Sequence, residues 1–278
     1  MEVGILYLPS VGSLEEKLKG FAGKRTDLYQ ELLHDLTVQS QYLDEHGYYG
    51  VGFTEHHFHI EGSEVSNNPT LLGAYLGPKT RRLRWGQLGY VLPAQHPIHM
   101  AEDVAMLDQM LQGRAFFGIA RGYQVRWVNS MGQLIPGLRD ARDFETYDRV
   151  KRERYEEHFE IVLKAWTQRT FTHKGKHWEF PVPDQVWPAA DFTRKLGTGV
   201  DADGVVTEIG IAPPCYNNRA GHVPAVQLFG HLAALGGAQQ ADPVSLVCDQ
   251  DLVQEHFTAF RDEATLPGRS TGINASLP

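Results

Sequence analysis

Residues 81–122 read RRLRWGQLGYVLPAQHPIHMAEDVAMLDQMLQGRAFFGIARG, and this stretch decides the fold class of the protein. It begins with an apolar run rich in β-forming residues, 83–92, and ends with a second short apolar run, 115–120. Between them, Pro97 suits the first turn of a helix, because proline lacks only an amide that would have no partner there. Apolar residues then recur at helical spacing, and Gly113 predicts the end of the helix. Strand, helix and strand in this order form a βαβ unit, which predicts parallel strands.

The same alternation of strands and helices extends along the chain on both sides of this unit. We count about four βα units up to residue 188 and at most about six in all. The predicted strands are 3–8, 50–55, 83–92 and 115–120, with weaker ones at 208–212, 225–229 and 244–247. The predicted helices are 28–46, 69–76, 97–111, 144–166 and 251–264. A hairpin is predicted at 170–188, a turn at 201–204, and long loops at 10–27 and 123–143.

The length of the chain bounds the number of domains. A chain of 278 residues can bury one sizeable core, and α/β barrels of this size commonly form a single domain. We therefore expect one α/β domain over residues 1–266, followed by a flexible tail at 267–278. The pattern weakens in the C-terminal third, so it leaves open whether a barrel is complete.

Charge, hydropathy and cysteine content narrow the class of protein. The net charge is −8, with no basic stripe, which argues against binding to nucleic acid. No apolar run is long enough to span a membrane. The start, MEVGILYLP, enters a strand without the features of an export signal, so a cytoplasmic location is expected. The two cysteines, Cys215 and Cys248, do not make a disulfide framework.

A cluster of reactive side chains, EHHFH at residues 55–59, follows the strand predicted at 50–55. It lies at the carboxyl end of that strand, where α/β barrels build their active sites. Alternation along the strand places His56 on the same side as Gly52 and Thr54, so its imidazole is a candidate general base or hydrogen-bond donor. A structural histidine is an equally good interpretation. A metal site is less favoured, because successive strand positions face opposite ways and no cysteine or helical histidine pair accompanies them.

Two further features point to a ligand, although each has an ordinary structural explanation. Arg121 ends the strand at 115–120 between small residues, and a guanidinium at this edge suits a phosphate or carboxylate. A simple ion pair explains an isolated arginine better. Gly86 and Gly89 lie inside a predicted strand, which allows close approach of a flat ligand or of packed backbone. The sequence contains no nucleotide-binding glycine loop.

Taken together, a set of motifs resembles the bacterial luciferase-like flavin monooxygenases. They agree with that family in order and spacing across most of residues 1–188, including the segment KGKHWEFP. The motifs are TEHHF at 54–58, NPTLLGA at 68–74, LGYVLPAQHP at 88–97, AEDVAMLDQMLQGR at 101–114 and GIARGY at 118–123. The resemblance implies a TIM-type (β/α)₈ barrel, usually dimeric, either as a homodimer or as a related heterodimer.

The resemblance also implies a chemistry. Relatives with these motifs take reduced FMN from a separate flavin reductase and use O₂ to oxygenate a small aldehyde, ketone or aromatic compound through a C4a-(hydro)peroxyflavin. A deazaflavin is the alternative cofactor. The alternative function is a non-catalytic flavin-binding protein or accessory subunit derived from the same barrel.

Individual residues match the motifs of the family by position. His56 matches the catalytic histidine beside the flavin. Leu88 and Gly89 match the strand dipeptide, often joined by a cis peptide bond, on which the flavin ring rests. Arg121 matches a phosphate-binding arginine, and Arg154 is the candidate for a second. The expected substrate pocket comprises Tyr7, Glu55, His57 and Tyr123.

The C-terminal third departs from the family pattern. The segment VPAVQLFGHLAALGGAQQ, residues 223–240, places His231 and Ala234 where the family has hydroxyl side chains that complete the phosphate site. Two hydroxyl hydrogen bonds, worth on the order of 1 kcal/mol each, would then be missing. The last two βα units also lack a clear counterpart. Weaker flavin binding and the non-catalytic alternative both follow from this departure.

Overall fold

The structure is a computed structural model that describes residues 4–135, 144–216, 225–228 and 242–243. The chain divides into two compact units. The first unit comprises Met1–Val91, Met110–Ala120 and Pro224–Pro278, and the second comprises Leu92–Gln109 and Arg121–Val223. The predicted tail at 267–278, the predicted strand at 244–247 and the predicted helix at 251–264 lie outside the described residues.

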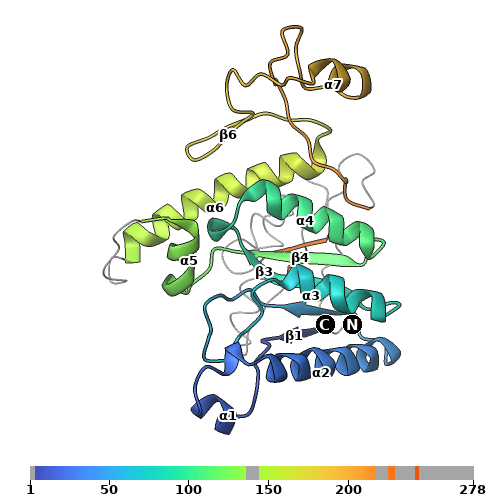
Figure 1. Cartoon of the computed structure of the whole chain (residues 1–278), viewed down its shortest axis with the longest axis vertical. Helices are drawn as coiled ribbons and strands as arrows, with labels where there is room; N and C mark the ends of the chain where they lie inside the picture. The colour runs from blue at the N-terminus through green and yellow to red at the C-terminus, as the bar shows by residue number, and fades with distance from the viewer. Residues whose placement is uncertain (1–3, 136–143, 217–224, 229–241, 244–278) are drawn as a thin grey trace, which may run out of the picture. The chain divides into compact units, whose positions relative to one another are not determined.

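The first unit is built on a parallel sheet of six strands in the order β1-β2-β3-β4-β7-β8 (Figure 1). Each neighbouring pair is parallel, which confirms the α/β class that residues 81–122 predict. The strands are β1 Gly4–Tyr7, β2 Gly50–Phe53, β3 Arg84–Val91, β4 Ala115–Ala120, β7 Ala225–Leu228 and β8 Asp242–Pro243. Closure into an eight-stranded barrel stays a prediction.

Two helices of the first unit, α2 (Thr26–Glu45) and α3 (Pro69–Leu76), lie side by side and agree with the predicted helices (Figure 1). The prediction of a loop at 10–27 was wrong in part, because this stretch contains α1 (Leu14–Leu18) and the 3₁₀ helix η1 (Ala22–Lys24). A second 3₁₀ turn, η2 (Gly77–Lys79), follows α3.

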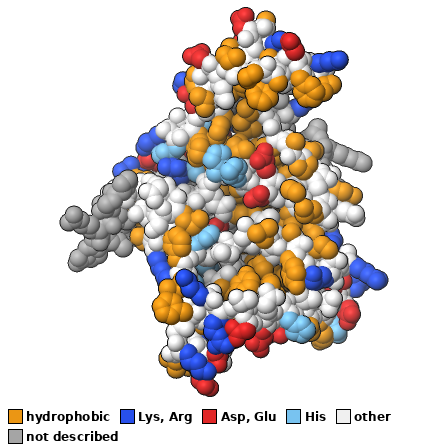
Figure 2. Space-filling view, in the orientation of Figure 1, with side chains coloured by type: hydrophobic (Ala, Val, Ile, Leu, Met, Phe, Trp, Pro, Cys, Tyr) orange, Lys and Arg blue, Asp and Glu red, His pale blue; other side chains and the backbone are white. Residues whose placement is uncertain are grey.

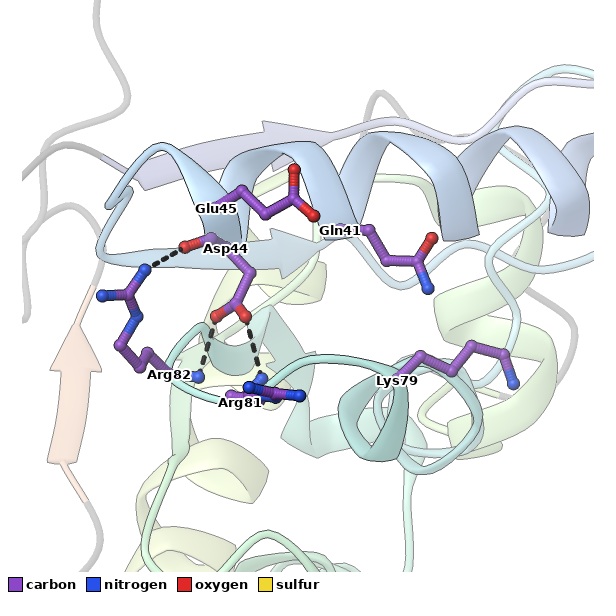
Figure 3. A pocket seen from close by; sticks show the side chains of 6 residues that line it. All are labelled: Gln41, Asp44, Glu45, Lys79, Arg81 and Arg82. Carbon is purple, nitrogen blue, oxygen red and sulfur yellow. Dashed lines mark hydrogen bonds between the residues drawn. The ribbon is translucent and has the colours of Figure 1, made fainter.

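The carboxylate of Asp44, in the last turn of α2, fixes the entry into β3. It accepts hydrogen bonds from the backbone nitrogens of Arg81 at 2.9 Å and Arg82 at 2.8 Å (Figure 3), and from that of Leu83 at 2.6 Å. The guanidinium of Arg82 also donates to the carbonyl oxygen of Asp44 at 2.8 Å. Burial acts against ionisation, but these backbone donors hold the pKa of Asp44 below its ordinary value. The carboxylate therefore joins α2 to β3 at the amino end of the strand.

The contact between β3 and β4 explains the glycines inside β3. The pairing register shifts between Gln87 and Tyr90, and the Leu88–Gly89 peptide bond in this interval is cis. A Cβ atom on Gly89 would stand 2.7 Å from the carbonyl oxygen of Gly118 on β4. Real Cβ atoms do not approach backbone this closely, so the strand pairing itself requires glycine at this position.

The second unit consists mainly of helices. The long helix α6 packs on α4, where the indole nitrogen of Trp166 donates to the carbonyl oxygen of Ala101 at 3.0 Å (Figure 1). Both α5 and α6 pack against the 3₁₀ turn η3. The elements are η3 Leu92–Ala94, α4 Pro97–Met110, α5 Val125–Gly132, α6 Phe144–Thr167, β5 His173–Lys174, β6 Glu179–Phe180 and α7 Ala190–Leu196.

Several predictions for the second unit are confirmed and others are wrong. The helices α4 and α6 and the antiparallel hairpin of β5 and β6 lie where the sequence predicts them. The loop predicted at 123–143 contains α5, and α7 was not predicted. Residues 208–212 form no strand and contribute only an isolated bridge from Ile209 to Phe171. The segment around α7 exposes apolar side chains (Figure 2).

No helix in the described ranges combines the length and the apolar character needed to cross a membrane.

Candidate functional site

His56 follows β2 in the first unit and is buried, with 6% of its surface exposed. Its Nδ1 lies 3.1 Å from the hydroxyl of Thr54, and its backbone nitrogen donates to the carbonyl oxygen of Ser66 at 3.0 Å. Its Nε2 lies 3.9 Å from the carboxylate of Glu64, which is also 3.8 Å from Nε2 of His59. Burial lowers the pKa of His56, and the negative charge of Glu64 opposes this effect. The imidazole is therefore held in place on one side and faces an ionisable partner on the other.

Glu55 and His57 contact each other at the same edge of the sheet. One carboxylate oxygen of Glu55 lies 2.9 Å from Nε2 of His57, and the other accepts a hydrogen bond from the backbone nitrogen of Val91 at 2.8 Å. Glu55 is 3% exposed, so its carboxylate is buried between the ends of β2 and β3. These contacts show a structural role for Glu55, and a role in a substrate pocket stays a prediction.

The two tyrosines of the expected substrate pocket differ in environment. Tyr7, the last residue of β1, donates from its hydroxyl to the side-chain oxygen of Gln39 at 2.7 Å and stacks on Phe53. Burial raises the pKa of Tyr7, so its phenol stays protonated at neutral pH. Tyr123, in the second unit, is exposed and accepts a hydrogen bond from the side chain of Gln124 at 3.0 Å.

A cavity of about 270 Å³ lies beside His56 in the first unit. It is lined by residues from η1, from α2 and from the loop after β2. The lining residues are Gly23, Lys24, Tyr29, His56, Phe58, His59, Ile60, Val65 and Asn67. The sequence gives no sign of Lys24 and Tyr29 as members of this group, because about 30 residues of chain separate them from His56.

A larger hollow of about 730 Å³ lies at the amino end of β3, lined by charged residues around Asp44 (Figure 3). Its lining residues are Gln41, Asp44, Glu45, Lys79, Arg81 and Arg82. It is therefore at the opposite end of the strands from His56, which follows the carboxyl end of β2. We assign it no part in the candidate site.

In the second unit, positively charged side chains surround the carboxylate of Asp148 on α6. The guanidinium of Arg121 donates to both carboxylate oxygens, at 3.1 and 3.0 Å. Nζ of Lys151 is 3.7 Å away and the guanidinium of Arg152 is 3.6 Å away. Burial opposes ionisation of Asp148, but Arg121 and the two other cations lower its pKa. We call Arg121, Asp148, Lys151 and Arg152 the cationic cluster; its positive charges outnumber its negative one.

Lys151 is the least exposed cation of this cluster, at 4%. Its ammonium donates to the carbonyl oxygen of Gly122 at 2.7 Å and lies 5.0 Å from the centre of the Tyr147 ring. Burial lowers the pKa of Lys151, and Asp148 opposes this effect. The spacing of Lys151 and Arg152, three and four residues after Asp148 on a helix, was a sequence signal for the contact that we did not use.

Arg154 does not join the contacts to Asp148. Its Nε is buried and has no hydrogen-bond partner among the described residues. Burial lowers the pKa of Arg154, and Glu157 opposes this effect. A partly buried guanidinium nitrogen without a partner is a group that an anionic ligand can satisfy.

The cations of the second unit suit, by their chemistry, the phosphate of a flavin mononucleotide. The surplus positive charge of the cationic cluster and the unsatisfied Nε of Arg154 suit a phosphate. The cis bond at Leu88–Gly89 is the feature that the resemblance implies for a flavin-supporting strand. In the described part of the chain, no group of three or more His, Cys, Asp or Glu side chains is arranged to hold a metal ion. The expected hydroxyl replacements, His231 and Ala234, lie outside the described residues.

Comparison with known proteins gives a match over most of the chain. The sequence pattern of a family described as luciferase-like monooxygenase matches residues 14–207. The chain is 26% identical over 209 residues to the 3,6-diketocamphane 1,6-monooxygenase of Pseudomonas putida, and this alignment covers 73% of the chain and 51% of that relative. The chain thus spans about half the length of this relative.

Solved structures agree on the fold. The oxygenating constituent of 3,6-diketocamphane monooxygenase from Pseudomonas putida, in complex with FMN, superposes with a TM-score of 0.67 at 21% identity, covering 97% of this chain and 64% of that one. An F420-dependent secondary alcohol dehydrogenase, in complex with an F420-acetone adduct, superposes with a TM-score of 0.59 at 12% identity, covering 86% of this chain and 62% of that one. At these identities the likeness shows a shared fold.

Proposed function

The chain belongs to the luciferase-like monooxygenase family, and on that premise we propose that it is the oxygenase component of a two-component flavin-dependent monooxygenase. It would receive reduced FMN from a separate flavin reductase and insert one oxygen atom of O₂ into a small organic substrate. The observation that carries the proposal is that the family match contains His56, the Leu88–Gly89 dipeptide, Arg121 and Arg154. A deazaflavin stays the alternative cofactor, since one structural neighbour binds F420.

The residues of this chain would bind the cofactor in two ways. Arg121, with Lys151 and Arg152, would hold the phosphate. The buried Nε of Arg154 would donate a hydrogen bond to the same phosphate. Leu88 and Gly89 would support the flavin ring, as the resemblance to the family implies. When bound, the reduced flavin supplies the electrons that activate O₂.

His56 would move the proton that the reaction requires. Because burial lowers the pKa of its imidazole, His56 can accept a proton at neutral pH, and Glu64 can stabilise the charged form. Tyr7, Glu55, His57 and Tyr123 would lie around the substrate. The rest of the chain would exclude water, so that the reactive oxygen species meets the substrate first.

We also propose that the protein acts as a dimer, with a second copy or with a related chain. The neighbouring helices α2 and α3 carry large apolar side chains that are exposed, which is the composition expected at a subunit interface. These side chains are Val38 and Tyr42 on α2 and Leu71 and Tyr75 on α3.

A second candidate is a non-catalytic flavin-binding protein or accessory subunit. The observation that favours it is the hydrogen bonding of Arg121 to Asp148, because this carboxylate competes with a phosphate for the same guanidinium. A chain that binds flavin weakly or in the wrong place would not oxygenate a substrate.

Single turnover with isotopic oxygen separates the two candidates. The protein is mixed anaerobically with reduced FMN, then with ¹⁸O₂ and a panel of ketones, aldehydes and aromatic compounds, and the products are analysed by mass spectrometry. The oxygenase proposal predicts a product that gains one ¹⁸O atom. Flavin binding without labelled product supports the accessory protein, and the absence of both binding and product contradicts both candidates.

A further inference from the structure

The cavity beside His56 is held open by backbone that is fixed in an unusual conformation. Phe58 and Glu64, at the two ends of the loop around it, have φ angles of 67° and 50°, in the left-handed region that non-glycine residues rarely adopt. Such conformations persist where the surrounding structure determines them, and they gather at ligand sites. A Cβ atom on Gly23 would stand 2.5 Å from the carbonyl oxygen of His59, so η1 approaches the loop as closely as glycine permits.

Backbone hydrogen bonds tie this loop to the rest of the first unit. Gly23 donates to the carbonyl oxygen of Ile60 at 3.0 Å, and Val11 donates to that of Gly62 at 2.8 Å. The carbonyl oxygen of Ser66 accepts from His56. Because both ends and the middle are anchored, the cavity is a pre-formed space, and its volume lies just below the usual range for small-molecule sites.

The chemistry of the lining is divided between donors and apolar groups. Lys24, Tyr29 and Asn67 bring an ammonium, a phenol and an amide, and the two imidazoles of His56 and His59 add ring nitrogens. Burial raises the pKa of Tyr29, so its hydroxyl stays a donor at neutral pH. The apolar lining residues are Phe58, Ile60 and Val65.

None of the described residues that line this cavity is acidic. The carboxylate of Glu64 lies 3.9 Å from His56 and 3.8 Å from His59 but does not itself line the cavity, and the ammonium of Lys24 is the principal positive group of the lining. Lys24 is exposed at the rim of the cavity, and an ammonium beside neutral donors recognises a carboxylate by charge-assisted hydrogen bonds.

We propose that this cavity binds the carboxylate of a small, otherwise apolar organic acid, with Lys24 and Tyr29 as the groups that select for the charge. The identification of that acid as the substrate rests on the proposed function, and it would place the substrate against His56. Binding of the acid itself depends only on the cavity.

Benzoate, an apolar ring with one carboxylate, is the probe, and benzamide is its uncharged counterpart of the same shape. Titrations of the full chain are followed by NMR of the histidine ring protons and by calorimetry. We expect benzoate to shift the signals of His56 and His59, and to bind at least about tenfold more tightly than benzamide. Lys24→Met should weaken benzoate binding about tenfold and Tyr29→Phe severalfold.

The control variant is Lys19→Met, which removes a lysine that pairs with Glu16 on α1 and does not line the cavity. It should bind benzoate as the unaltered protein does. The inference is overturned if benzoate and benzamide bind equally, if neither binds, or if Lys24→Met and Lys19→Met give the same affinity.

Failure of this inference is distinct from failure of the proposed function. FMN affinity and labelled product are measured on the same protein samples. Benzoate selectivity without labelled product supports the cavity assignment and counts against the oxygenase. Labelled product without benzoate selectivity supports the oxygenase and counts against the cavity assignment.

Discussion

The imidazole of His158 gives the sharpest quantitative prediction for the second unit. This side chain on α6 is fully buried, and its Nδ1 lies 2.8 Å from the carbonyl oxygen of Leu92. Its Nε2 accepts a hydrogen bond from the indole nitrogen of Trp178 at 2.8 Å. These two contacts define one neutral tautomer, with the proton on Nδ1, that joins η3, α6 and the β5–β6 hairpin. Replacement by leucine removes both bonds and leaves the indole nitrogen of Trp178 without its acceptor, whereas the carbonyl oxygen of Leu92 keeps its hydrogen bond from the backbone nitrogen of Gln95 at 3.1 Å.

The expected loss of stability follows from these contacts. The unsatisfied indole donor of Trp178 costs about 1–3 kcal/mol, and the lost hydrogen bond to the carbonyl oxygen of Leu92 adds about 1 kcal/mol. We therefore expect His158→Leu to lower the free energy of unfolding by about 2–4 kcal/mol at neutral pH. Urea unfolding followed by tryptophan fluorescence and circular dichroism measures this quantity.

The same contacts predict a pH dependence that serves as a control. Burial lowers the pKa of His158 from 6.5 to about 4. The unfolded chain therefore binds a proton below pH 6.5 that the folded chain does not, and the stability contributed by the neutral imidazole is full above pH 6.5 and falls as pH falls toward 4. At about pH 5 this titration should have lowered the free energy of unfolding of the unaltered protein by roughly 2 kcal/mol.

His158→Leu lacks this titration, so its deficit relative to the unaltered protein should be smaller at about pH 5 than at about pH 7.5, by roughly 2 kcal/mol. Other buried histidines contribute equally to both proteins and cancel in the difference. An equal deficit at both pH values would refute the assignment of a neutral, doubly hydrogen-bonded imidazole.

Further substitutions test other parts of the account. Asp44→Ala removes a carboxylate that binds three backbone nitrogens, and it should cost about 2–4 kcal/mol in urea unfolding; an exposed acid such as Asp191→Ala should change little. Because the pKa of Asp44 is lowered, this stability is present above its unfolded pKa and is lost as pH falls through the folded value, so the penalty should shrink in acid. Gly89→Ala places a Cβ 2.7 Å from the carbonyl oxygen of Gly118 and should cost about 1–3 kcal/mol, and an unchanged unfolding midpoint would contradict the packing argument. His56→Gln should lower the yield of oxygenated product about 100-fold or more while FMN affinity changes less than about twofold; full activity would remove His56 from the reaction.

The sequence predicts the parallel strands well because their signals are local. The bounds of β4 and of α3 agree with the predicted ranges, since each is a compact apolar run between a turn residue and a polar segment. The helix α1 also has a local signal, a Ser13 cap that accepts from the nitrogen of Glu16, and we did not use it. The helix α5, which buries Trp127 and Val128, was missed because it begins inside a segment with polar and glycine residues.

The candidate site is harder to predict because its members depend on long-range packing. The resemblance selects His56 and Arg121, but neither motif indicates that Asp148 hydrogen-bonds to Arg121 across 27 residues of chain. The approach of Lys24 and Tyr29 to His56 likewise depends on how η1 meets the loop after β2. Only the folded chain shows that Gly89 faces Gly118. The strand pairing therefore requires glycine at this position, independently of any cofactor.

FMN binding tests the central claim most directly. Oxidised and reduced FMN are titrated into the full chain by calorimetry, in parallel with Arg121→Ala and with Arg149→Ala, which removes a neighbouring exposed arginine paired with Glu153. We predict one FMN per chain, a loss of about tenfold or more in affinity for Arg121→Ala, and no change for Arg149→Ala. Absence of saturable FMN binding, or equal affinities for the two variants, would contradict the account.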